Sequence, residues 1–91
     1  MSIYTGQGFV RINLTLNEDI SASSSNKIIY KKPNGTTGEW DAEVVGTNVM
    51  RYNAGNTTFD IPGIWRVQPK FVLGGLVGYG KPYDFKIEKL L

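Results

Sequence analysis

The sequence predicts an all-β protein, and three observations lead to that prediction. Apolar and polar residues alternate along several short segments, as they do in strands with one face in a core. No segment repeats its apolar residues at helical spacing. Eleven glycines and four prolines interrupt the chain at short intervals, which is typical of strands joined by turns. Strands are expected, in order, at residues 9–16, 27–31, 39–45, 49–53, 64–73, 76–81 and 82–90.

Turn residues separate these segments. Pro33 followed by Asn34-Gly35 predicts a hairpin, because Asn-Gly suits a turn with positive φ. Pro62-Gly63 predicts the turn that enters the longest strand. Gly74-Gly75 predicts a second, compact hairpin. The serine-rich segment 17–26 is expected to be an exposed loop.

The longest strand carries Trp65, Val67 and Phe71 on one face and polar residues on the other. We expect Trp40 and Trp65 to meet in the core as opposing plugs, with Phe71 packed against them and Phe85 pointing inward from the last strand. About seven short alternating strands predict an immunoglobulin-like antiparallel β-sandwich. A small open barrel would show the same pattern.

The amino-acid composition argues against several classes of function. A chain of 91 residues is expected to form a single domain, 1–91. It contains neither Cys nor His, which excludes disulfides, thiolate metal sites and histidine-dependent catalysis. The net charge of +2 does not indicate a nucleic-acid partner, and no apolar run is long enough to span a membrane. We therefore expect a protein that is not an enzyme, binds no cofactor or metal, and has no nucleic-acid or membrane partner.

Acidic residues offer two alternative sites. Glu39, Asp41 and Glu43 are predicted on one face of a single strand, where a carboxylate pair or a calcium site is conceivable. A solvated strand face is the preferred interpretation, because catalytic carboxylates usually face each other across a cleft. Glu18-Asp19, with Asp84 or Glu88 from elsewhere, offers oxygen atoms for a calcium site, but the chain has no acidic loop of the calcium-binding type.

Two segments are candidate contact sites. The N-terminal arm, 1–7, carries Ile3 and Tyr4, which could lie along the edge of a neighbouring sheet. The second hairpin carries three apolar residues in a glycine-rich setting, namely Leu76, Val77 and Tyr79. Exposed apolar residues on small domains often mark contacts. The alternative, that these side chains complete the protein's own core, is equally open.

Two sequence strings carry a resemblance to a known family. The string IIYKKPNGTTGEW at 28–40, followed by DIPGIW at 60–65, resembles small immunoglobulin-like proteins of tailed bacteriophages and prophages, and the N-terminal domains of phage baseplate upper proteins. The resemblance implies an immunoglobulin-like fold and a non-enzymatic role in the virion: tail, baseplate, fibre attachment or capsid decoration. The implied partners are other virion structural proteins or copies of the chain itself. It implies no particular binding residues.

Other function classes remain open on the sequence. A carbohydrate- or host-surface-binding module would use exposed aromatic residues, for which Tyr4, Tyr79 and Tyr83 are candidates. An inhibitor of a host protein is a third class. Position on the particle, oligomeric state and partner are not encoded in any recognisable motif.

Overall fold

The computed structural model describes residues 3–8 and 10–91 and shows an all-β chain. The described residues form nine strands and no helix, and hence no helix that could cross a membrane. Met1 and Ser2 of the predicted arm, and Phe9 at the predicted start of the first long strand, lie outside the described residues. The strands are β1 (Ile3–Tyr4), β2 (Val10–Thr15), β3 (Ser25–Lys31), β4 (Thr37–Asp41), β5 (Glu43–Val45), β6 (Val49–Ala54), β7 (Gly63–Leu73), β8 (Leu76–Tyr79) and β9 (Tyr83–Glu88).

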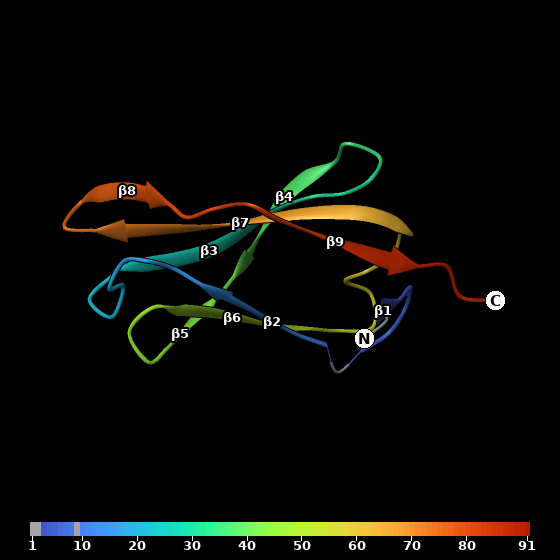
Figure 1. The fold of residues 1–91 in the computed structure, drawn as a ribbon, viewed down its shortest axis with the longest axis horizontal. Coiled ribbons are helices and arrows are strands. Elements are labelled where there is room, and N and C mark those ends of the chain that lie inside the picture. The colour runs from blue at the N-terminus through green and yellow to red at the C-terminus, as the bar shows by residue number, and fades with distance from the viewer. Residues whose placement is uncertain (1–2, 9) are drawn as a thin grey trace.

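The strands form two sheets, which lie one above the other in Figure 1. The six-stranded sheet has the order β1-β9-β7-β3-β4, with β8 also paired to β7. The three-stranded sheet has the order β2-β6-β5. All pairs are antiparallel except β1 with β9, which is parallel. The molecule is elongated, measuring 46 × 24 × 19 Å.

Strand β7 is the centre of the larger sheet. Trp65, Val67, Pro69 and Phe71 are buried and alternate with more exposed residues, so the predicted face assignment of this strand is confirmed. On one side β7 pairs with β3 from Arg66 to Val72. On the other side it pairs first with β9 and then with β8.

The change of partner along β7 takes place at a β-bulge opposite Pro69. Val67 pairs with Tyr83, and Lys70 pairs with Tyr79, so the β8–β9 side contains one residue more than the β7 side. The Pro69 carbonyl accepts a hydrogen bond from the Gly80 N–H at 3.0 Å. Since a residue's N–H and C=O point to the same side of a strand, the N–H that proline lacks would also face this break. A proline is therefore accommodated in a central strand.

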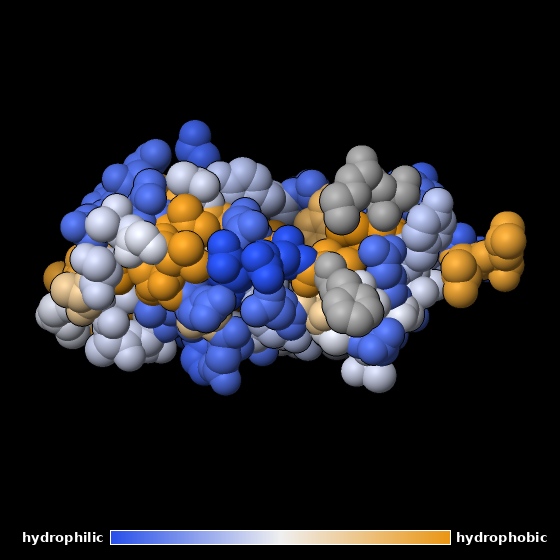
Figure 2. Space-filling model, turned by 90° about the horizontal axis from the view of Figure 1, so that it is seen from below, coloured by the Kyte–Doolittle hydropathy of each residue, from blue (hydrophilic) through white to orange (hydrophobic). Residues whose placement is uncertain are grey.

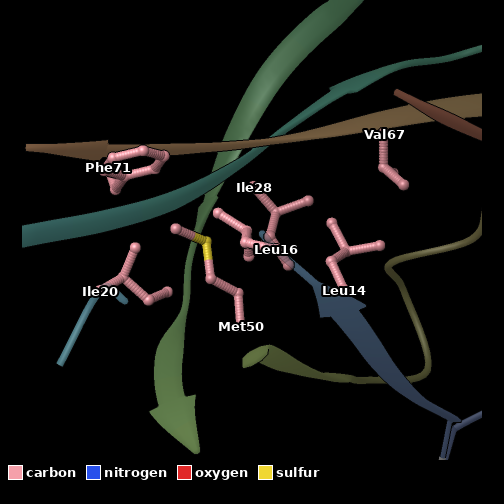
Figure 3. Close-up of a cluster of buried hydrophobic side chains, with 7 residues drawn as sticks. All are labelled: Leu14, Leu16, Ile20, Ile28, Met50, Val67 and Phe71. Carbon is pink, nitrogen blue, oxygen red and sulfur yellow. The ribbon is translucent and has the colours of Figure 1, made fainter. Parts of the chain in front are cut away.

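The core lies between the two sheets. Figure 3 shows buried side chains from both sheets and from the segment after β2 pointing toward one another; they are Leu14, Leu16, Ile20, Ile28, Met50, Val67 and Phe71. A second cluster consists of Val10, Ala54, Phe59, Trp65 and Ile87. Trp40 and Phe85 are partly buried and pack against both clusters.

Trp40 and Trp65 meet in the core as expected, but they do not oppose each other across it. Both residues belong to the six-stranded sheet, on β4 and β7, and their ring centroids are 6.3 Å apart. The three-stranded sheet opposes Trp40 with Tyr52, whose ring stacks on it at 4.5 Å and 3°. Phe59, from the loop before β7, meets Trp65 edge-on at 5.3 Å. Phe71 belongs to the other cluster, against which Trp40 also packs, but the Phe71 ring forms no aromatic pair with Trp40 or Trp65.

The prediction of a single strand at 39–45 is also wrong, because this segment forms two strands in different sheets. β4 pairs with β3 in the larger sheet, whereas β5 pairs with β6 in the smaller one. Ala42 lies at the break, where its N–H bonds to the Asn26 carbonyl at 3.1 Å. Alternation of polar and apolar residues continues through the break because both sheets face the same core.

Both hairpins form where the turn residues predict them. Gly74 and Gly75 have φ of 60° and 79° and join Leu73 directly to its partner Leu76, as a two-residue hairpin requires. In the first hairpin the Gly35 N–H bonds to the Lys32 carbonyl at 2.9 Å, and the Lys32 N–H bonds to the Thr36 carbonyl at 2.8 Å. This turn is a three-residue loop, 33–35, in which Pro33 takes the second position of the β-turn from Lys32 to Gly35, rather than the Asn-Gly turn expected.

Candidate interaction surface

The β7–β8 hairpin carries the most exposed apolar group that belongs to a strand. Leu76, Val77 and Tyr79 have exposed fractions of 76%, 55% and 57%. The hairpin extends to one end of the elongated molecule (Figure 1). All three residues are among the predicted contact residues. The structure therefore places them on the surface rather than in the core.

The backbone of β8 is unpaired along its outer edge. β8 pairs only with β7 among the described residues. The turn closes at Leu73 and Leu76, and the Gly80 N–H points to the Pro69 carbonyl of β7. Because N–H and C=O groups alternate in direction along a strand, those of Leu76 and Gly78 face β7, while those of Val77 and Tyr79 face outward.

Gly78 allows the centre of β8 to pack closely against Phe71 of β7. Phe71, its cross-strand partner, lies so close that a Cβ at position 78 would collide with the phenyl ring. The ring thus covers the backbone of Gly78, as aromatic residues do beside glycines at sheet edges. The inner side of β8 is therefore supported, while its outer edge is left open.

The other free edges in the described part of the chain carry charges or are very short. The edge strand β4 carries Glu39 and Asp41, β5 carries Glu43, and β2 carries Arg11. β1 has only two residues. Charged residues and short length are the usual means of preventing unwanted strand pairing. β8 has four residues and no charged side chain, so it lacks this protection.

The described part of the predicted docking arm lies along the edge of the protein's own larger sheet. Ile3 and Tyr4 form β1, which pairs with Ile87 and Glu88 of β9. Ile3 is half-buried and packs against the second core cluster, whereas Tyr4 is 42% exposed. β1 and β8 lie toward opposite ends of the molecule in Figure 1. The two predicted contact segments are therefore separate surfaces.

Tyr79 and Tyr83 line one surface hollow of about 470 Å³, together with Phe71, Glu18 and Lys81. Tyr83 reaches from β9 across to β2, where its hydroxyl donates a 3.4 Å hydrogen bond to the Thr15 carbonyl. Tyr4 is not part of this hollow. The structure therefore brings together two of the three tyrosines expected for sugar binding.

The charged outer face of the larger sheet is largely paired internally. Arg66 donates two hydrogen bonds to the Asp84 carboxylate, at 2.7 and 3.1 Å. Lys70 lies 3.5 Å from Glu39, and Lys27 pairs with Asp41. The hydrogen bond from Arg66 lowers the pKa of Asp84, and the bond with Asp41 raises the pKa of Lys27. Gln68 donates to the Gly80 carbonyl at 2.9 Å, so this face consists mainly of contacts within the chain.

The three-stranded sheet has a similar polar exterior. Arg11 donates to the Asn53 amide oxygen at 3.2 Å, and Arg51 donates to that of Asn13 at 3.0 Å. Figure 2 shows this side of the molecule with hydrophilic residues across its middle and apolar surface toward its ends. The middle of the face therefore resembles an ordinary solvated surface.

The acidic residues do not form a common site. Glu43 lies on β5 and is separated from Glu39 and Asp41 by the change of sheet, so the prediction of one acidic strand face is wrong. Asp19 caps its own loop by accepting bonds from the Ser21 N–H at 2.9 Å and hydroxyl at 2.6 Å, which lowers its pKa. Within residues 3–8 and 10–91, no group of three or more acidic residues is placed to hold a metal ion.

Ile64 is an exposed residue that the sequence pattern did not single out. It is 56% exposed and lies opposite Lys86 on the outer face of the larger sheet. Its position next to Trp65 in a strictly alternating strand is the signal that places it outside.

Comparison with protein-family models, with curated proteins and with solved structures gives no match to this chain.

Proposed function

We propose that this chain is a non-enzymatic structural protein of a tailed bacteriophage virion that acts by docking to other proteins through an exposed strand edge. The observation that carries the proposal is β8, an edge strand that pairs with β7 but has no partner on its outer side among the described residues, with Leu76, Val77 and Tyr79 exposed and no charged side chain. An uncharged, apolar edge invites pairing with another chain. The resemblance of segments 28–40 and 60–65 to phage immunoglobulin-like proteins supports the virion location.

The fold we infer is an immunoglobulin-like β-sandwich. The order β9-β7-β3-β4 in one sheet agrees with the three-stranded sheet of such a domain with one added strand, and β2-β6-β5 agrees with three of the four strands of its other sheet. The shared core between the sheets supports the same inference. The contacts of the two resemblance segments support it further, because they hold the sheet together.

Two of those contacts are specific. The Tyr30 ring packs over Gly38 and stacks on Trp40, with ring centroids 4.6 Å apart. Pro33 lies against Gly63, where an added Cβ would be 2.8 Å from the proline ring. The first hairpin and the turn before β7 are therefore joined. A framework of this kind holds β8 in a defined position for display, which is the mechanism we propose.

Purified particles test the proposal. Virions separated on a density gradient are digested and the chain is quantified against the major capsid protein by mass spectrometry. We expect a constant copy number per particle that is a multiple set by the symmetry of one virion part. Recovery of the chain only in the lysate supernatant, with none in particles, contradicts the proposal.

A second candidate is a carbohydrate- or host-surface-binding module. The observation that favours it is the hollow lined by Tyr79 and Tyr83, because sugars stack on aromatic rings and pair with charged groups such as Glu18 and Lys81 beside them. Titration of an oligosaccharide panel against the chain and against Tyr83→Ala tests it. Binding that Tyr83→Ala abolishes supports this function, and the absence of binding by the whole panel contradicts it.

A further inference from the structure

We infer that the partner of β8 is the β8 strand of a second copy, paired antiparallel about a two-fold axis. The inference rests on the proposed docking role and specifies its partner. The outward backbone groups of β8 belong to Val77 and Tyr79, and no described strand satisfies them. An extended strand is the partner that supplies alternating donors and acceptors at this spacing.

The strand is complementary to itself in one register. A two-fold axis at Gly78 places Val77 opposite Tyr79 of the second copy, and Tyr79 opposite Val77. The outward N–H and C=O groups of these residues then bond to one another. A β-branched residue opposite an aromatic one is among the favourable cross-strand pairs. The two glycines at position 78 meet at the axis, where the absence of side chains leaves no clash.

Charge does not oppose this arrangement. β8 has no charged side chain, and Lys70, the cross-strand partner of Tyr79, is held 3.5 Å from Glu39 of its own chain. A symmetric pair of β4 strands centred on Trp40 would bring like charges together, because Glu39 would face Asp41 of the second copy. A second copy is therefore better accommodated at β8 than at β4.

The pair is expected to be weak in free solution. Three exposed side chains present on the order of 300 Å² of apolar surface, whereas each partner in a stable interface buries about 800 Å². We expect a dissociation constant on the order of 10 μM to 1 mM, at the weak end of protein–protein contacts. Copies arranged symmetrically on a particle have a high effective concentration, which converts such a contact into a persistent one.

Sedimentation equilibrium and ¹⁵N-correlation spectra of the whole chain, recorded from micromolar to millimolar concentration, test the inference. We expect a monomer–dimer equilibrium, with concentration-dependent shifts centred on the amides of 76–80. Val77→Lys is expected to raise the dissociation constant at least about tenfold. Ile64→Lys, at a similarly exposed site distant from β8, is the matched control and should leave it unchanged.

A charge exchange tests the register itself. Tyr79→Glu alone should weaken the dimer, whereas Val77→Lys combined with Tyr79→Glu places an ammonium opposite a carboxylate in both symmetric pairs and should restore it. Circular dichroism and the unfolding temperature of each variant show that the fold is kept. A wild-type chain that stays monomeric at millimolar concentration, a dimer that survives Val77→Lys, or a double variant without recovery would overturn the inference.

This inference and the proposed function fail in different experiments. A chain that is found in particles but is monomeric in solution, with no shifts at 76–80, removes the self-pairing and leaves the virion role. A chain that dimerises through β8 but is absent from particles removes the virion role and leaves the self-pairing.

Discussion

The Tyr30 ring lies over Gly38, its cross-strand partner, and occupies the space that a side chain at position 38 would fill. The same ring stacks on Trp40 with centroids 4.6 Å apart, and its centroid is 5.9 Å from that of Trp65. A glycine two residues before a tryptophan is therefore a packing requirement of this sheet. It explains why Tyr, Gly and Trp occur together in segment 28–40.

Gly38→Ala should lower the free energy of unfolding by about 2 kcal/mol, because the added methyl group forces Tyr30 out of its stack. Chemical denaturation followed by tryptophan fluorescence measures this effect. Gly55→Ala is the matched control, since a Cβ at Gly55 meets nothing within 4 Å. The control should leave stability unchanged or raise it by up to about 1 kcal/mol. Equal losses in both variants would refute the packing role of Gly38.

Met50 and Leu76 are apolar residues that should respond very differently to truncation. Met50 is fully buried between the sheets, and Leu76 is 76% exposed. Met50→Ala is expected to cost about 2–5 kcal/mol because it leaves a cavity. Leu76→Ala is expected to change stability by less than about 0.5 kcal/mol. A large loss for Leu76→Ala, measured by the same denaturation experiment, would show that the hairpin belongs to the core.

Gly80 is expected to be essential to the bulge opposite Pro69. A Cβ at this position would be 2.6 Å from the Pro69 ring, which is itself buried. Gly80→Ala should therefore destabilise the chain by about 1–3 kcal/mol. Hydrogen exchange should show the loss of protection first at Gly80 and then along β8. A uniform loss of protection over β3 and β9 would show that the substitution does not act at the bulge opposite Pro69.

The Arg66–Asp84 pair predicts an acid dependence of stability. The Asp84 pKa is lowered in the folded chain, chiefly by the hydrogen bond from Arg66. Its contribution is therefore present above the unfolded pKa of about 3.9 and disappears as pH falls through the lower folded value. Asp84→Asn should be less stable than wild type at neutral pH, and the difference should vanish at strongly acidic pH. The effect should be small because the pair is exposed.

The unfolding temperature, measured at intervals from neutral to strongly acidic pH, checks this prediction. Glu43→Gln serves as the control, because Glu43 makes no ion pair within the part of the chain that the structure describes. A difference between wild type and Asp84→Asn that grows on acidification has the opposite sign to that expected from a lowered Asp84 pKa.

Alternation predicted the strands well because each strand has one face against a shared core. It placed Trp65, Val67 and Phe71 inside, as the structure does. Alternation failed to predict the break within 39–45. A segment that passes from one sheet to the other keeps the same side chains facing the core, so the alternating pattern does not change at the break. The pairing of β1 with β9 could not be predicted from the sequence either, because a contact between residues 3 and 87 has no local sequence signal.

The surface was harder to predict than the core. Leu76, Val77 and Tyr79 have the composition of a buried strand, but Val77 and Tyr79 lie opposite Val72 and Lys70 on the outer face of the larger sheet. Leu76 lies on the inward face with Gly78, at the end of the molecule, and is exposed there. No local pattern records how far the opposite sheet extends. The glycines at 74 and 75 did predict the two-residue turn, because two successive positive φ angles favour this residue type.

The central claim is that β8 is a docking edge in an assembled particle. An electron cryomicroscopy map of the intact virion tests it most directly. We predict density for the two-sheet chain in which the Leu76–Tyr79 edge is covered by another strand. A map in which the chain is present with that edge facing solvent, or one with no density for the chain at all, would contradict the claim.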